Sequence, residues 1–177
     1  MDHEPFDLRS WISNLLSTGR LPTSLDLHVI RQYAARSGFD PTATTRAGGR
    51  LSGLSWQGRI LEGGDVLNVA EVHFLRHVVV GREWPTGTTM SEYVSSLTNA
   101  VRDDNGPVLL DVKLGVPRLT FFSQDRVSQL HGTTSWTLVG FDVHYGYWTT
   151  GFRTPVSPEQ YRQHLSSSLR RWLHPPT

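Results

Sequence analysis

The feature that most limits the possible folds is a change in the spacing of apolar residues at Pro107. Before it, apolar residues recur every three or four positions, as on one face of a helix. After it, the segments 108–114, 118–122, 135–144 and 147–153 have the alternation, or the β-branched and aromatic content, of strands. Their connections are too short for crossover helices, so we predict a four-stranded antiparallel meander.

Helices are predicted on both sides of this sheet in the chain. Residues 6–18 and 25–37 have helical spacing, and Thr89 with Glu92 forms a capping box that opens another helix. Ser157 and Pro158 open a last helix. Its predicted buried face carries Tyr161, Leu165, Leu169 and Trp172. We therefore expect an α+β fold, with N-terminal helices, a helix pair packed on a four-stranded antiparallel sheet, and a C-terminal helix.

A domain boundary is predicted where Gly, Ser and Thr are concentrated, over residues 42–64. Residues 1–64 would form a helical hairpin and a Gly-rich linker, with a loop or small β-hairpin around Trp56. Residues 65–177 would form the helix-plus-sheet domain. The linker contains neither of the glycine motifs that bind nucleotide phosphates, so its glycines do not indicate a nucleotide site.

Composition excludes several classes of chemistry. The chain has no cysteine, which rules out disulfides, iron–sulfur clusters, thiolate zinc sites and a cysteine nucleophile. A net charge of +1 gives no overall attraction to nucleic acid, so any RNA contact depends on a local patch. The N-terminus is neither basic nor apolar, and no apolar run approaches the roughly 18 residues of a membrane span. We expect no membrane contact, and a protein that is cytoplasmic or exported without a cleaved signal peptide.

The pattern most indicative of chemistry lies in residues 68–80, where His73 and His77 are four residues apart and Arg76 lies between them. On a helix, side chains four residues apart are neighbours, so both imidazoles should lie together. Two groups that titrate near neutral pH, beside a fixed cation, suit proton transfer. A structural role, in which His73 packs at the junction of helix and sheet and His77 caps a hydrogen-bond network, explains the pair slightly better when the motif is taken alone.

A zinc site is the other chemistry that two helical histidines suggest. The zincin motif has Glu directly after its first histidine, whereas Phe74 follows His73 here. Further ligands would have to come from His131, His144 or an acidic residue of the sheet. We therefore expect no metal and no other cofactor.

Several short motifs together resemble a known superfamily. They are Arg76-His77 late in a helix, a linker with Pro85, a helix with Tyr93, and strands that end in Thr150-Gly-Phe152. Over about residues 66–152 the chain resembles the superfamily of small endoribonuclease toxins that includes barnase, EndoU, colicin D and RelE. Within that superfamily, it resembles the phage-associated and polymorphic-toxin members. It is also similar to the RNase A-like toxin domains of contact-dependent inhibition. Their two helical histidines are five residues apart, and their last strand ends in Thr-x-Tyr.

The resemblance implies metal-independent cleavage of RNA, with tRNA among the candidate substrates. The ribose 2′-hydroxyl would attack the adjacent phosphate, which requires a base, an acid and donors that stabilise the phosphorane. His77 would be the principal acid or base, and His73 its partner. Arg76 and Arg153 would hold the phosphate, and Thr150 would donate a hydrogen bond to it.

The alternation of side chains along a strand leaves one assignment open. Thr150 should share a face with Trp148 and Phe152, which are typical of a core, whereas Thr149 should share its face with Tyr147 and Arg153. In a regular sheet Thr149 would therefore contact the phosphate. Tyr147 or Tyr145 could stack on a base, although aromatic residues in a strand more often serve packing.

A protein without enzymatic activity is the second hypothesis. An interaction, immunity or regulatory protein could retain a nuclease-like fold, and a protein partner such as a cognate antitoxin or immunity protein is expected under either hypothesis. An enzyme requires His73 and His77 to face an open cleft lined by arginine. Burial of both rings against aromatic residues of the strands would favour the interaction protein.

Overall fold

The computed structural model describes residues 6–125 and 134–177. The helices and strands in this part of the chain are α1 (Leu8–Thr18), α2 (Ser24–Ser37), β1 (Thr44–Arg46), β2 (Ser55–Trp56), β3 (Arg59–Ile60), β4 (Val66–Asn68), α3 (Val69–Phe74), the π-helix η1 (Leu75–Val80), α4 (Met90–Arg102), β5 (Val108–Lys113), β6 (Val116–Gln124), β7 (Trp136–Asp142), β8 (Tyr147–Thr154), α6 (Pro158–His164) and β9 (Leu169–His174). Among them, five strands form one antiparallel sheet in the order β8-β7-β6-β5-β9. No helix within the described residues has the length and hydropathy to span a bilayer.

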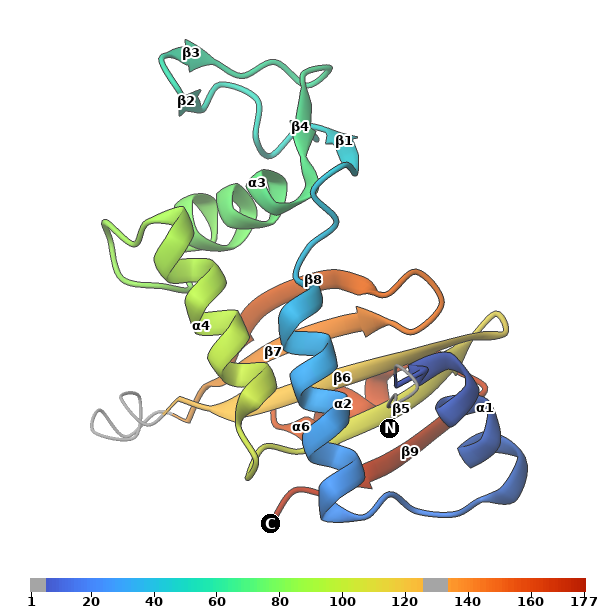
Figure 1. Ribbon diagram of the computed structural model, residues 1–177. Coiled ribbons are helices and arrows are strands. Elements are labelled where there is room, and N and C mark those ends of the chain that lie inside the picture. Colours follow the sequence, from blue (N-terminus) through green and yellow to red (C-terminus); the bar gives the residue numbers. More distant parts are fainter. Residues whose placement is uncertain (1–5, 126–133) are drawn as a thin grey trace, which may run out of the picture.

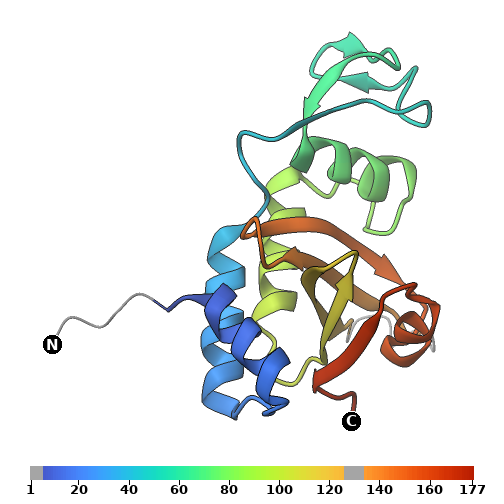
Figure 2. The same ribbon diagram turned by 90° about the vertical axis from the view of Figure 1, so that its right-hand side faces the viewer.

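Helices cover both faces of the sheet. Figures 1 and 2 show α1, α2 and α4 on one face and α6 on the other. The main core lies on the first face and includes Ile12, Ile30, Leu97 and Phe121, all fully buried. A smaller cluster on the second face contains Leu109, Phe122 and Leu138, with Tyr161 and Trp172 packed against it. The predicted α+β class and the antiparallel sheet are confirmed.

Side chains at the helix N-termini explain where four of the helices begin. Thr89 caps α4 and Ser157 caps α6, and in each the side chain of the third helical residue, Glu92 or Gln160, accepts a hydrogen bond from the backbone amide of the cap residue. These two predicted starts are confirmed. The same capping boxes, at Thr23 and Asn68, open α2 and α3.

The C-terminal part of the prediction is wrong in one respect. The helix that was expected to continue to Trp172 ends at His164, and β9 follows and pairs antiparallel with β5. Trp172 packs in the smaller cluster while the adjacent Leu173 packs in the main core. Neighbouring residues that are buried on opposite sides require a strand. Pairing with β9 also gives hydrogen-bond partners to the backbone groups on the outer edge of β5. The sheet therefore has five strands in the described residues rather than the four predicted.

Residues 44–68, which we call the lobe, extend from α3 away from the sheet in both views (Figures 1 and 2). β1 pairs with β4 at its base, and β2 and β3 form a hairpin beyond it. The hairpin turns at Gln57 and Gly58, which both have positive φ. The small hairpin predicted around Trp56 is thus confirmed. The expected domain boundary at residue 64 falls within the lobe, and Leu61 and Leu67 on its two sides belong to the same core cluster.

A β-bulge in β8 changes which side chains share a face. Gly140 pairs with Thr150 and Phe141 pairs with Trp148, so Thr149 is the extra residue. Gly140 permits this arrangement, because a Cβ there would lie 2.9 Å from the Thr149 hydroxyl. Trp148 consequently packs in the main core and Phe152 in the smaller cluster. The prediction that Trp148, Thr150 and Phe152 share a face assumed a regular strand and is wrong.

Candidate functional site

The two histidines lie where an α-helix becomes a π-helix. His73 belongs to α3, whereas Arg76 and His77 belong to η1. The amide of Gly81 donates to the carbonyl of Arg76, five residues earlier, at 2.8 Å. A Cβ on Gly81 would lie 2.8 Å from that same oxygen, so glycine is needed where the π-helix ends. π-helical turns inside helices are frequent at functional sites.

His73 and His77 are neighbours, as predicted. Their rings are nearly parallel, with centroids 5.8 Å apart. Phe39 stacks on the other side of His73 at 5.2 Å, and Phe152 stacks on the other side of His77 at 5.5 Å. These four rings, which we call the ring stack, join α3 and η1 to the edge strand β8.

His73 is the enclosed member of the ring stack. Its Nδ1 atom is buried and has no hydrogen-bond partner among the described residues. Burial, with smaller contributions from nearby His77 and Arg76, lowers the pKa of His73 to about 4, although the backbone of Thr149 opposes this decrease. The His73 ring is therefore neutral at physiological pH and is unsuited to exchanging protons with a ligand.

His77 has a different environment. Its side chain is 22% exposed, and its Nδ1 atom lies 2.8 Å from Oε1 of Glu83. The other carboxylate oxygen of Glu83 accepts a hydrogen bond from the backbone amide of Arg153 in β8, also at 2.8 Å. A carboxylate at Nδ1 favours the tautomer with its hydrogen there, which leaves Nε2 for a ligand. Within the described residues, the His77 ring makes no other hydrogen bond.

A pocket of about 550 Å³, which we call the histidine pocket, opens beside His77. One wall is the loop of Gly48, Gly49 and Arg50 from the lobe, and the opposite wall includes Arg76, His77 and Glu83. Arg76 and Arg50 are exposed, and neither forms an ion pair with another described residue. A Cβ on Gly48 would lie 3.5 Å from the Arg76 guanidinium, so the loop and this cation are close. The pocket thus combines two cations with an imidazole held by a carboxylate, an arrangement suited to an anionic ligand and proton transfer.

Arg153 does not line the histidine pocket. Its Nη1 atom lies 3.4 Å from a carboxylate oxygen of Asp125, and its guanidinium lies 4.8 Å from the ring centre of Trp84. Its backbone amide, rather than its charge, contacts the site through Glu83.

The other candidate residues are distributed along β8. Thr149 is exposed and Thr150 is half-buried, and neither lines the histidine pocket. Tyr147 lines a separate groove at the other end of the strand. His131 lies outside the described residues, and the part of the chain that is described contains no cluster of three or more potential metal ligands.

Arg50 and Glu83 are the site residues that the sequence analysis missed. Glu83 lies six residues after His77, beyond a glycine that ends the helix. This short spacing with a glycine between is a local signal that the carboxylate can turn back toward His77. Arg50 follows two glycines in the Gly-rich linker, and nothing local to the sequence places that loop beside Arg76.

The structure therefore brings together only part of the predicted set, namely His73, His77 and Arg76. Searches of protein-family models, curated proteins and solved structures found no match to this chain.

Proposed function

We propose that this protein is a metal-independent endoribonuclease of the toxin type, and that RNA is cleaved in the histidine pocket. The observation that carries this proposal is the environment of His77. Its imidazole is held by Glu83 at 2.8 Å, and it lines a pocket of about 550 Å³ together with Arg50 and Arg76. Oriented imidazoles beside paired arginines suit phosphodiester chemistry, because the arginines bind the phosphate and stabilise the charge that develops on it.

One imidazole can carry out the proton transfers of this reaction. Nε2 of His77 takes the proton of the ribose 2′-hydroxyl while the 2′-oxygen bonds to phosphorus. The bond from phosphorus to the 5′-oxygen breaks, and His77 returns the proton to that leaving oxygen. The products are a 2′,3′-cyclic phosphate and a 5′-hydroxyl, so atoms and charge balance. Arg50 and Arg76 hold the nonbridging oxygens throughout.

His73 has a positioning role in this proposal. Its ring is neutral and enclosed between Phe39 and His77, so it supports the His77 ring instead of meeting the substrate. Arg153 likewise acts through its backbone amide, which holds Glu83. Thr149 and Thr150 lie outside the histidine pocket, and this mechanism uses neither.

The burial of His73 favours a second candidate function. A histidine packed against Phe39 serves the fold, as in an interaction or regulatory protein that retains a nuclease-like architecture. In that case the arginines of the histidine pocket would bind an acidic protein partner.

Incubation of the purified protein with total RNA and with tRNA in EDTA tests the proposal. The expected result is cleavage by the wild type that leaves 2′,3′-cyclic phosphate ends, and no cleavage by His77→Ala. His164→Ala is the control, because His164 is an exposed histidine at the end of α6 and does not line the histidine pocket.

Three other results of this experiment would contradict the proposal, each in a different way. Equal cleavage by the wild type and His77→Ala would remove His77 from the mechanism. Cleavage that disappears in EDTA would show a metal-dependent reaction. No cleavage of any RNA by the wild type would favour the interaction protein.

A further inference from the structure

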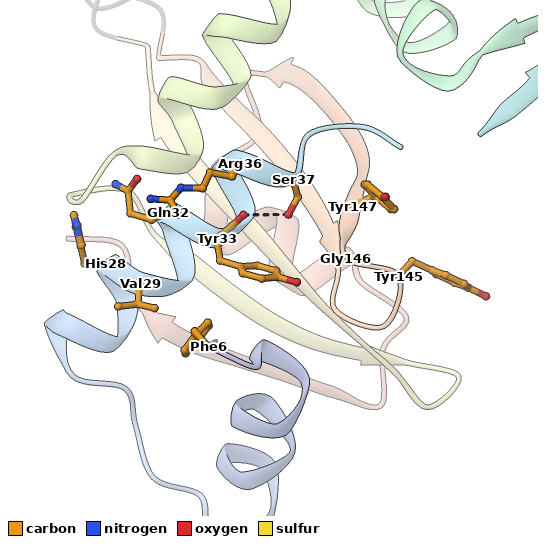
Figure 3. Close-up of a pocket in the computed structure, with 10 residues that line it drawn as sticks. All are labelled: Phe6, His28, Val29, Gln32, Tyr33, Arg36, Ser37, Tyr145, Gly146 and Tyr147. Atoms are coloured by element: carbon orange, nitrogen blue, oxygen red, sulfur yellow. Dashed lines mark hydrogen bonds between the residues drawn. The ribbon is translucent and has the colours of Figure 1, made fainter. Parts of the chain in front are cut away.

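A second concave surface lies between α2 and the turn that joins β7 to β8. This groove, of about 720 Å³, is larger than the histidine pocket and does not share any residue with it. Figure 3 shows Tyr33 reaching from α2 toward Gly146, with Tyr147 beside the turn and Tyr145 extending outward from it. Phe6 lies below Tyr33, and Arg36 extends from α2 on the other side. We call this surface the tyrosine groove.

The turn holds Tyr145 in solvent on a fixed backbone. The Asp142 side chain accepts hydrogen bonds from the amides of His144 and Tyr145 at 2.7 and 2.8 Å, and the Gly146 amide donates to the Asp142 carbonyl at 2.8 Å. Tyr145 is nevertheless 71% exposed. An aromatic ring that is exposed on a rigid turn is pre-organised for stacking, because little backbone entropy is lost when a ligand binds.

The groove also contains a cation, Arg36, that has no ion-pair partner among the described residues. Arg36 is exposed and forms no ion pair with any described residue, whereas His28 at the same surface lies 3.6 Å from Asp104. Tyr33 is 39% exposed, and its ring makes a T-shaped contact with that of Phe141. Aromatic rings and an exposed guanidinium with no ion-pair partner in the described part of the chain are the two elements that bind unpaired bases and their phosphates.

Strand β8 connects the tyrosine groove with the histidine pocket. It begins at Tyr147, and Phe152, whose ring stacks on His77, follows five residues later. At ~3.3 Å per residue these positions are separated by roughly 17 Å. We propose that the tyrosine groove binds unpaired bases of the same single-stranded RNA that the histidine pocket cleaves. This inference rests on the proposed function, since it takes RNA as the ligand.

Binding of RNA to a cleavage-deficient protein tests the inference without relying on catalysis. The probe is a fluorescent single-stranded RNA of about ten nucleotides, and the readout is its anisotropy with full-length His77→Ala protein. Adding Tyr145→Ala or Arg36→Ala should weaken binding about fivefold or more, as expected for the loss of one stacked base or one phosphate contact. A duplex of the same sequence should be bound equally by all of these proteins, because its bases are already stacked.

Two matched variants serve as controls. Tyr145→Phe keeps the ring and should bind as tightly as the parent. Arg102→Ala removes an exposed arginine from the last turn of α4, as Arg36→Ala does from α2, and should have no effect. Equal binding by Tyr145→Ala, Arg36→Ala and the parent would overturn the inference. So would the absence of any binding by the parent, and cleavage by the wild type would then show separately whether the proposed function stands.

Discussion

His73 and His77 have the same side chain, lie four residues apart and face each other in the ring stack, yet they differ in almost every property that matters for chemistry. His73 is covered by Phe39, has an unpartnered Nδ1 among the described residues, and has a pKa lowered to about 4. His77 is bound by Glu83 and opens onto a pocket with two arginines. The lesson is that a histidine motif does not define a site, because the partners of each ring decide whether it serves packing or proton transfer.

The strongest test of this comparison replaces each histidine in turn and compares the rates of RNA cleavage. His77→Ala should reduce RNA cleavage by roughly 100-fold to 10,000-fold, the range for loss of a general acid or base. His73→Phe keeps a stacked ring and removes a buried unsatisfied nitrogen, so its rate should stay within about threefold of the wild type. Initial rates on one RNA substrate in EDTA measure both. An equal loss in the two variants would make His73 a direct participant.

The pH dependence of stability between pH 6.5 and about pH 4 should come from His73. The unfolded state binds a proton near pH 6.5, whereas the folded state does so only near pH 4, so the free energy of unfolding decreases as pH falls through this window. The total decrease is about 3 kcal/mol, at about 1.4 kcal/mol per pH unit. Below about pH 4 this contribution is lost completely. Urea unfolding at several pH values measures it, and His73→Phe should lose that part of the pH dependence. A wild-type profile parallel to that of His73→Phe would contradict the assignment.

The bulge at Thr149 can be tested through Gly140. Gly140→Ala would place a Cβ 2.9 Å from the Thr149 hydroxyl and 3.0 Å from a methyl group of Thr150. We expect a loss of about 2 kcal/mol in the free energy of unfolding, and slower cleavage because the bulge sets Phe152 against His77. Gly64→Ala is the control, since no atom lies within 4 Å of the added methyl group. Equal stability of the two variants would mean that the bulge relaxes without strain.

The smallest expected effect is on substrate binding by the lobe. Arg50→Ala should raise KM about fivefold, near 1 kcal/mol, and weaken the salt dependence of KM, because one phosphate contact is removed. It should also lower kcat, because Arg50 stabilises charge that develops on the phosphate. Arg46→Ala removes an exposed arginine of the same lobe that does not line the histidine pocket, and should change KM little. A larger effect from Arg46 than from Arg50 would move the substrate to a different surface of the lobe.

Local signals predicted most of the fold. The capping boxes at Thr89 and Ser157 and the alternation after Pro107 depend on nearby residues, and the structure confirms the elements that they open. The C-terminal strand was missed because Tyr161, Leu165, Leu169 and Trp172 also fit a helical period. Only the partner strand β5, which lies about sixty residues earlier in the chain, decides between the two structures.

Only those parts of the candidate site that are formed by residues close together in the sequence could be predicted. The neighbouring positions of His73 and His77 follow from helical geometry, and the structure confirms them. The approach of Arg50 to Arg76 depends on how the lobe folds over η1. The contacts of Arg153 with Asp125 and Trp84 depend on how the end of β6 and the loop before α4 meet β8. The extra residue in β8 is visible in the sequence only as Gly140 on the neighbouring strand.

The pairing of β5 with β9 has a consequence for folding during synthesis. β5 meets β6 almost as soon as both have left the ribosome, but its other edge has no partner until residues 169–174 have been translated. Until then a buried apolar strand presents an unpaired backbone edge, which is a template for pairing with another nascent chain. Synthesis of this protein therefore includes an interval in which aggregation competes with completion of the sheet.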